Sequence, residues 1–367
     1  MSSEQFATEP VGTPDHRPAI SAPDALSPAA LADARRAQPK RGLIGLAFVL
    51  PVAALLAAGA GGPAHSVVVL APVVTFSLPV VAMIAFWWED WPGSLLRGGW
   101  SGVYDTVVVV AAGLVLTDLG QRVAAGVVLW GPAAPGLGAA YPDTLPLAAG
   151  IFTIMLQLTL VNEGWPLRGL GRLRSGVAAL AVCWVAGSVV FLGLVRPGVV
   201  SVESYGAWLT AVGVWQMVWY VVLRGWPFAR IRRRPVRLAV ANVVVVACGW
   251  GSHLLASELI GWSPGWITAV SGAGIASVLV VSMLFEAWPA IRFDPLPGRS
   301  LALVTVVLLT ALLSWALPML AQLTGVPAVE VSGWVTHATL NALSVAVILH
   351  VAVWRRWPAG ASTSTSD

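Results

Sequence analysis

Long apolar segments alternate with short polar segments along most of the chain. Each apolar segment is roughly twenty residues long, the length that an α-helix needs to cross the hydrocarbon core of a membrane. These segments lie near residues 43–61, 66–88, 103–118, 145–162, 175–195, 206–224, 237–257, 265–287, 301–322 and 334–354. The pattern predicts an all-α polytopic bundle with about ten transmembrane helices.

The third apolar segment is the least regular. It is short, and Asp118, Gln121 and Arg122 follow it directly. The region 119–146 is rich in Gly and Pro. We expect this region to be either a long loop or a re-entrant segment.

Both ends of the chain differ from the rest. Residues 1–40 are rich in Pro, Ala, Ser, Asp and Glu and contain no long apolar run. Such a composition is typical of a disordered chain. We therefore predict a disordered cytoplasmic tail at 1–40, a ten-helix transmembrane domain at 41–358 and a disordered cytoplasmic C-terminus at 359–367.

The composition supports a membrane environment. The chain is 57% hydrophobic and only 10% charged, with a mean hydropathy of +0.80. A soluble domain has about 25% charged residues, so a water-soluble protein is excluded. The net charge of +4 is spread over loops and does not suggest a nucleic-acid partner. Lys40 is the single Lys among 21 basic residues, a bias that fits a GC-rich bacterial genome.

The basic residues are concentrated in the N-terminal tail and in the loops that follow every second apolar segment. Of the 21 basic residues, only Arg122 and Arg196 fall on the other side of the predicted topology. Lys and Arg are enriched in cytoplasmic loops of membrane proteins. We therefore expect a multi-pass protein of the cell membrane with both termini in the cytoplasm.

A Trp-Pro pair ends every second apolar segment. The pairs begin at Trp91, Trp165, Trp226, Trp288 and Trp357. Trp prefers the headgroup level of a membrane, and Pro disfavours helical conformation in the residue before it. We interpret these Trp residues as interfacial anchors of five parallel-orientation hairpin repeats. The repeats cover about residues 41–92, 93–166, 167–227, 228–289 and 290–358.

A few polar side chains lie within or at the ends of the apolar segments, where they are costly and therefore functional candidates. The expected substrate or ion path uses Gln157, Gln216, His253, His337 and Asn341. His253, Glu258 and His337 are weak candidates for catalytic residues, because His with a carboxylate suits both proton transfer and a transition metal. Their spacing matches no metal-binding motif, so neither a firm metal site nor a cofactor follows.

Three classes of function fit these features. The leading interpretation is transport or permeation of a small molecule or ion through polar residues in the bundle. The alternatives are a structural or accessory subunit of a membrane complex, and a membrane-embedded enzyme that acts on a lipid or other hydrophobic substrate. Expected partners are the lipid bilayer, anionic lipid headgroups at the basic loop 228–237, and other membrane proteins or further copies of the chain.

Overall fold

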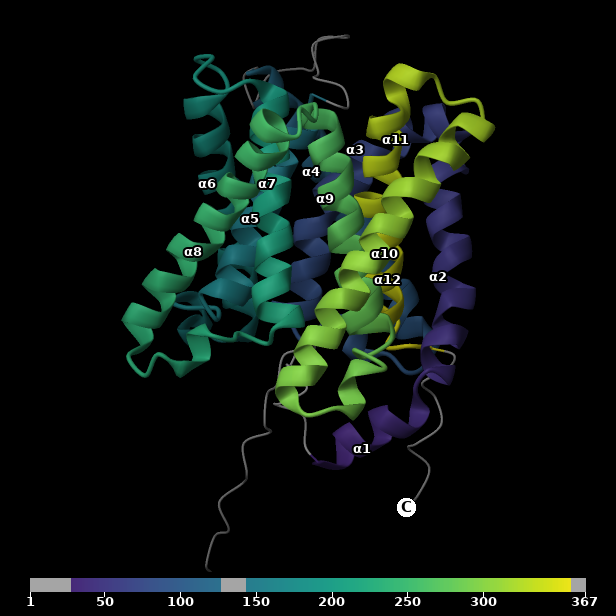
Figure 1. Ribbon diagram of the computed structural model, residues 1–367, viewed down its shortest axis with the longest axis vertical. Coiled ribbons are helices and arrows are strands. Elements are labelled where there is room, and N and C mark those ends of the chain that lie inside the picture. The colour runs from purple at the N-terminus through teal and green to yellow at the C-terminus, as the bar shows by residue number, and fades with distance from the viewer. Residues whose placement is uncertain (1–27, 127–142, 358–367) are drawn as a thin grey trace, which may run out of the picture.

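The computed structural model describes residues 28–126 and 143–357. Within these residues every regular element is a helix, and the helices form one upright bundle (Figure 1). Eight of the helices are long and apolar enough to cross a membrane. The prediction of an all-α polytopic membrane bundle is confirmed at this level.

Five helices of the bundle are continuous α-helices, or nearly so. They are α2 (Lys40–Ala58), α4 (Gly99–Ala125), α6 (Arg172–Leu194), α8 (Arg234–Leu254, continued by a π-helical turn at Leu255–Leu259) and α10 (Pro295–Leu323). We call these five the outer helices. In the apolar, membrane-crossing stretch of each outer helix, only 11–28% of the residues are buried inside the protein.

The other five helices alternate with these along the chain and end in a π-helical turn. They are α3 (Pro63–Ala82, then Met83–Trp87), α5 (Leu145–Leu156, then Gln157–Val161), α7 (Val202–Met217, then Val218–Val222), α9 (Pro264–Leu279, then Val280–Leu284) and a last helix of four parts, α11 (Val331–Thr336), His337–Leu343, α12 (Ser344–Ile348) and Leu349–Val353. We call these the inner helices. The crossing stretches of α3, α9 and the last helix are 72–83% buried.

The inner helices form a closed ring. α3 packs on α5, α5 on α7, α7 on α9, α9 on the last helix, and the last helix returns to α3. Each outer helix packs mainly on an inner helix of the preceding hairpin: α4 on α3, α6 on α5, α8 on α7, α10 on α9 and α2 on the last helix. The tightest helix pairs therefore join different hairpins, and the outer layer ties each hairpin to its neighbour.

Glycine permits the close approach of outer and inner helices. A Cβ added to Gly187 of α6 would lie 3.0 Å from the Cα of Ile151 on α5. A Cβ added to Gly249 of α8 would lie 2.8 Å from the Cα of Val212 on α7. Small residues allow such backbone contact between membrane helices.

The chain leaves every inner helix with the same backbone geometry. Three residues before each Trp, a backbone N–H donates to the carbonyl five residues earlier, as Trp88 does to Met83 at 2.9 Å. The next two residues have positive φ angles, as at Glu89 (50°) and Asp90 (61°). A cis Trp-Pro bond follows at the four pairs that lie wholly in the described part of the chain. All five turns lie at one end of the bundle, which we call the Trp-Pro end.

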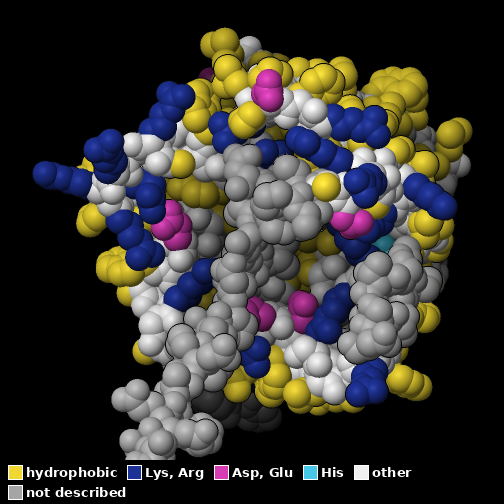
Figure 2. All heavy atoms as spheres, turned by 90° about the horizontal axis from the view of Figure 1, so that it is seen from below, with side chains coloured by type: hydrophobic (Ala, Val, Ile, Leu, Met, Phe, Trp, Pro, Cys, Tyr) yellow, Lys and Arg dark blue, Asp and Glu magenta, His cyan; other side chains and the backbone are white. Residues whose placement is uncertain are grey.

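Ion pairs connect these turns to other parts of the ring. Glu89 pairs with Arg172 at 3.9 Å, Glu163 with Arg237 at 2.8 Å, and Glu286 with Arg356 at 3.0 Å and Arg41 at 3.4 Å. Viewed from below, Lys and Arg side chains are spread around this end, with few carboxylates between them (Figure 2). Because these pairs are partly exposed, each adds about 0–1 kcal/mol and mainly fixes how the turns fit together.

Two parts of the chain differ from the sequence prediction. Residues of the expected disordered tail form α1 (Pro28–Ala37), which docks below the bundle (Figure 1). Arg35 Nε donates to the carbonyl of Ile291 at 2.8 Å, and Gln38 Nε2 to that of Leu284 at 3.3 Å. The sequence contains no apolar run that predicts this docking, because the contact depends on hydrogen bonds.

The third crossing is also longer than expected, since α4 continues to Ala125. Residues 127–142 of the predicted loop or re-entrant segment lie outside the described part.

Candidate functional site

A vestibule lies at the centre of the inner ring, at the end opposite the Trp-Pro turns. Its volume is about 420 Å³, and all five inner helices line it. Each contributes residues from its beginning, such as Val67, Leu145, Gly206, Thr268 and Thr336. A cavity of this size, formed by the convergence of several helices, is typical of a ligand or ion site.

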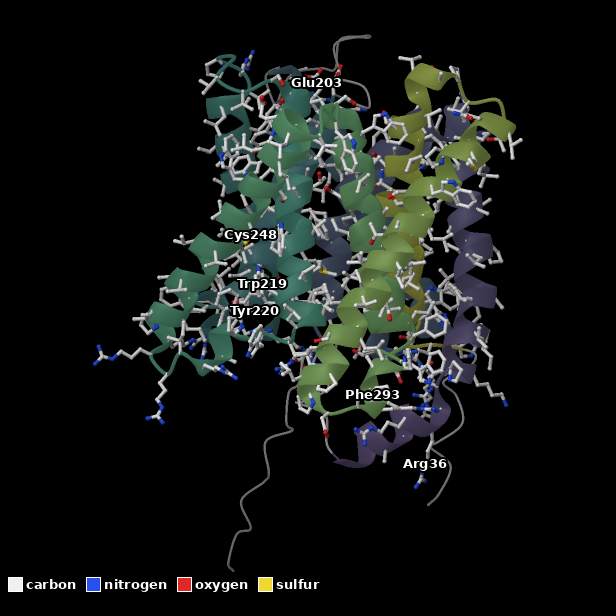
Figure 3. All side chains as sticks on the ribbon, in the orientation of Figure 1. Arg36, Glu203, Trp219, Tyr220, Cys248 and Phe293 are labelled. Atoms are coloured by element: carbon white, nitrogen blue, oxygen red, sulfur yellow. The ribbon has the colours of Figure 1, made fainter. Side chains whose placement is uncertain are left out.

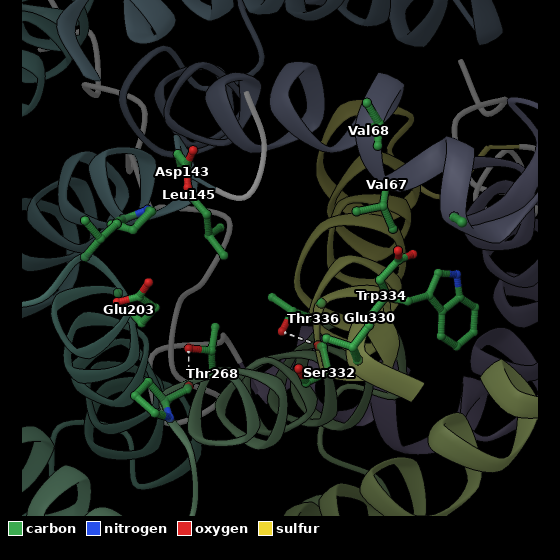
Figure 4. Close-up of a pocket in the computed structure, with 18 of the residues that line it drawn as sticks. Val67, Val68, Asp143, Leu145, Glu203, Thr268, Glu330, Ser332, Trp334 and Thr336 are labelled. Atoms are coloured by element: carbon green, nitrogen blue, oxygen red, sulfur yellow. Dashed lines mark hydrogen bonds between the residues drawn. The ribbon is translucent and has the colours of Figure 1, made fainter. Parts of the chain in front are cut away.

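The vestibule is acidic. Asp143, Glu203 and Glu330 line it, and no basic residue is among the lining residues that the structure describes. The three carboxylates stand around the central opening (Figure 4). The hydroxyls of Thr268 and Thr336 also line the wall, each bonded to a carbonyl of its own helix. An acidic mouth raises the local concentration of cations.

Below the vestibule, the centre of the ring is narrow and apolar. Only about 20 Å³ of free space remains there. One residue from each inner helix lines it at the same register, nine positions before the Trp of each Trp-Pro pair: Ala82, Leu156, Met217, Leu279 and Ile348. We call these five residues the apolar ring.

The apolar ring closes the axis in this structure. All five side chains are at most 7% exposed. The free space would admit about one water molecule, but a water needs two or more polar partners to be stable there. The polar side chain that borders the space is Ser344, whose hydroxyl donates to the carbonyl of Thr339 at 2.9 Å. The constriction is therefore dry.

Gln157 and Gln216, two residues of the expected path, lie behind the wall of the ring. Gln216 Nε2 donates to Gln157 Oε1 at 2.5 Å, and Gln157 Nε2 donates to Asn242 Oδ1 at 2.7 Å. Asn242 in turn donates to Asn162 at 2.8 Å. The axis is lined one position earlier on α5, by Leu156. The amides thus join α5 and α7 to α8, and the N–H groups of both glutamines are bonded within the wall; Gln216 Oε1 is buried and has no hydrogen-bond partner among the described residues.

His337 also faces an outer helix, and Asn341 lies against His337 on the same helix. His337 Nε2 lies 3.0 Å from the carbonyl of Leu56, and Asn341 Nδ2 lies 3.3 Å from His337 Nδ1. If Nε2 carries the proton, both contacts are hydrogen bonds of a neutral ring. Trp334 Nε1 donates to the next carbonyl, that of Ala57, at 3.1 Å. These side chains satisfy the unpaired carbonyls in the last turn of α2.

The three weak catalytic candidates do not gather at one place. His253 lies on α8, beside the ring of Trp250 at 5.9 Å, and is 7% exposed. Glu258 is exposed in the turn that follows. His337 belongs to the last helix, which packs on α2 and α9 on the opposite side of the bundle from α8 (Figure 1). In the described residues no group of three His, Cys, Asp or Glu side chains could hold a metal ion.

The Trp anchors surround the Trp-Pro end. Trp165 is 57% and Trp357 41% exposed, and Trp91, Trp226 and Trp288 are half-buried. The guanidinium groups of Arg230 and Arg292 lie over the rings of Trp226 and Trp288 at 5.8 and 5.9 Å. These positions agree with rings at a membrane–water boundary.

Sequence reasoning missed the residues that line the axis. The apolar ring consists of ordinary hydrophobic residues and had no distinguishing feature except its constant distance from Trp-Pro. Asn242 was also missed, although the rule that selected Gln157, a polar side chain within an apolar segment, applies to it equally. Glu203 and Glu330 lie just outside the predicted apolar segments, so the same rule did not select them.

No protein-family model, curated protein or solved structure matches the chain. Fold and site therefore define the class: a multi-pass membrane protein with an inner ring of five helices around an axis.

Asp90, in the first Trp-Pro turn, has a perturbed ionisation outside the membrane-spanning segments. Burial raises the pKa of Asp90 to about 6, and Arg355, 3.3 Å away, offsets this only in part. The neutral carboxyl is therefore favoured by the fold.

We expect Asp90 to make the protein less stable as the pH rises. Its folded pKa lies above the ordinary value of 3.8, so its contribution is fully present below about pH 4 and is lost as the pH rises through about 6. At pH 8, Asp90→Asn should be more stable than wild type by about 1–3 kcal/mol. Thermal unfolding of both proteins from pH 4.5 to 8 measures this difference. Parallel curves with a constant gap would contradict the assignment.

Proposed function

We propose that this protein lets small cations cross a membrane along the axis of the inner ring, and that the apolar ring is its gate. The observation that carries the proposal is the succession of two sites on one axis. An acidic vestibule of about 420 Å³ is followed by a dry constriction, and all five inner helices contribute to both. Apolar constrictions in channels close by expelling water.

The proposed topology has ten crossings in five hairpin repeats. Eight of these crossings are the long apolar helices, and the other two are the helices Leu145–Val161 and Val202–Val222. The Trp-Pro end, with most of the Arg residues, faces the cytoplasm, because Lys and Arg favour that side. The vestibule faces outward and collects cations from outside the cell membrane. The cyclic order of helix contacts supports the repeat, since each outer helix packs on the inner helix of the hairpin that precedes it around the ring.

Liposomes that contain the purified protein provide the test. We expect K⁺ to pass more readily than Cl⁻, and we expect this preference to fall when the vestibule loses its charge in Asp143→Asn, Glu203→Gln, Glu330→Gln. Glu258→Gln is the matched control, because it removes one carboxylate at the same end without touching the vestibule. A K⁺ preference that survives in the triple variant would contradict the proposal, and so would a flux equal to that of empty liposomes in wild type and in variants of the apolar ring alike.

The accessory-subunit interpretation is a second candidate, favoured by one observation. A mainly apolar groove of about 780 Å³ lies between α8 and α10, on the lateral face of the bundle over α7 and α9. A groove of this kind could receive a helix of another membrane protein. Liposomes without flux, in wild type and in variants of the apolar ring alike, would favour this alternative.

A further inference from the structure

A second cavity lies at the Trp-Pro end, between α5, α7 and α8. Its volume is about 350 Å³. We call it the basic pocket, after its charged lining residues: Glu163, Arg168, Arg224 and Arg237. Trp219 and Tyr220 mark its level in the lower half of the bundle, far from Glu203 at the top (Figure 3).

Positive charge exceeds negative charge in this pocket. Arg168, Arg224 and Arg237 face a single carboxylate, that of Glu163. Glu163 already pairs with Arg237 at 2.8 Å and with Arg234, outside the pocket, at 3.6 Å. The Nε of Arg237 is buried and has no hydrogen-bond partner among the described residues. Three guanidinium groups around one carboxylate suit an anion that can accept several hydrogen bonds.

The rest of the wall is apolar and aromatic. Tyr220 stacks on Phe228 with 6.1 Å between ring centroids and 16° between planes. Arg168 lies over the ring of Trp87 at 5.9 Å, which restrains this exposed side chain. Phe86 and Leu160 line both the basic pocket and the space inside the ring. The pocket therefore opens beside the inner mouth of the axis.

We propose that the basic pocket binds a phosphate-class anion that carries an organic group. The guanidinium groups of Arg168 and Arg237 would hold the phosphate oxygens, since Arg matches phosphate geometry with paired donors. The aromatic wall would hold the attached organic part, for which the volume leaves room. Bound there, the anion would lie next to Phe86 and Leu160 and could influence the axis.

The same chemistry has two sources. An anionic lipid headgroup could enter from the membrane, because the pocket lies at the level of the Trp-Pro turns, next to the basic segment 228–237. A free phosphate ester could enter from the aqueous side. Both present a phosphate to the same Arg residues, and the experiment separates them.

The test is calorimetric titration of the full chain in a neutral detergent. The three probes are short-chain phosphatidylglycerol, short-chain phosphatidylcholine and inorganic phosphate. Arg168→Gln and Arg237→Gln should each weaken binding roughly tenfold, since each removes charge-assisted hydrogen bonds. Arg174→Gln and Arg233→Gln are the matched controls, because both are exposed Arg residues nearby that do not line the pocket. Arg237→Gln also removes the pair with Glu163, so Arg168→Gln serves as the variant without that change.

Binding of phosphatidylglycerol alone would support the proposal with a lipid headgroup as ligand. Binding of inorganic phosphate as well would support it with a free anion as ligand. Absence of binding for all three probes, or equal affinity in all four variants, would overturn it. The titration requires no flux, so its failure and a failure of the permeation proposal are distinguished.

Discussion

Replacing Leu156 and Leu279 with Asn is expected to raise K⁺ flux through liposomes by at least about tenfold, because a tenfold change needs only ~1.4 kcal/mol off a barrier. Both side chains belong to the apolar ring and are at most 4% exposed. An ion in a dry apolar constriction loses its hydration without gaining partners, which is very costly. Two amides would admit water and lower this cost.

The control for this experiment adds the same polar group elsewhere. Leu308→Asn lies on α10, where Leu308 is 65% exposed on the outer face of the bundle. It should leave the flux at the wild-type level. The single variant Leu156→Asn replaces the double variant if the latter does not purify as one species. A well-folded ring variant with unchanged flux would show that the axis is not the path.

Gly249→Ala is expected to destabilise the protein by about 1–3 kcal/mol, the usual cost of overpacking a close contact. The new methyl group would lie 2.8 Å from Val212 Cα and 2.9 Å from Val212 N. These are backbone atoms, so no side-chain rotation relieves the contact, and α8 must move away from α7.

Gly251→Ala is the matched control, two residues further along the same helix. Nothing lies within 4 Å of a Cβ added there, and Ala is favoured over Gly inside a helix by up to about 1 kcal/mol. Thermal unfolding in detergent should therefore shift in opposite directions for the two variants. Equal shifts would mean that the contact between α8 and α7 does not limit stability.

The polar residues selected from the sequence show why a costly side chain in a membrane segment need not line a path. Gln157, Gln216 and His337 have hydrogen-bond partners on neighbouring helices, and Asn341 lies 3.3 Å from His337 on its own helix. The rule that such residues are expensive was sound, but for Gln157, Gln216 and His337 hydrogen bonds between helices offset part of that cost. The rule cannot say on which side of a helix the partner lies.

The sequence by itself predicted the apolar helices of the bundle and the end of every inner helix. Apolar length sets the crossings, and the Trp-Pro pairs set one end of every inner helix; both are local signals that need no knowledge of the neighbours. Their regular order along the chain also indicated five hairpins.

Only the tertiary structure decided which helices form the ring and which face the lipid. The mean hydropathy of the crossing stretch is 2.5 for α3 and 2.3 for α10, yet 72% of the first and 11% of the second are buried in the protein. The reason is that lipid and protein interior are both apolar, so hydrophobicity cannot separate them. The apolar ring and the vestibule exist only because five distant segments close around one axis, and the basic pocket only because α5, α7 and α8 meet beside it.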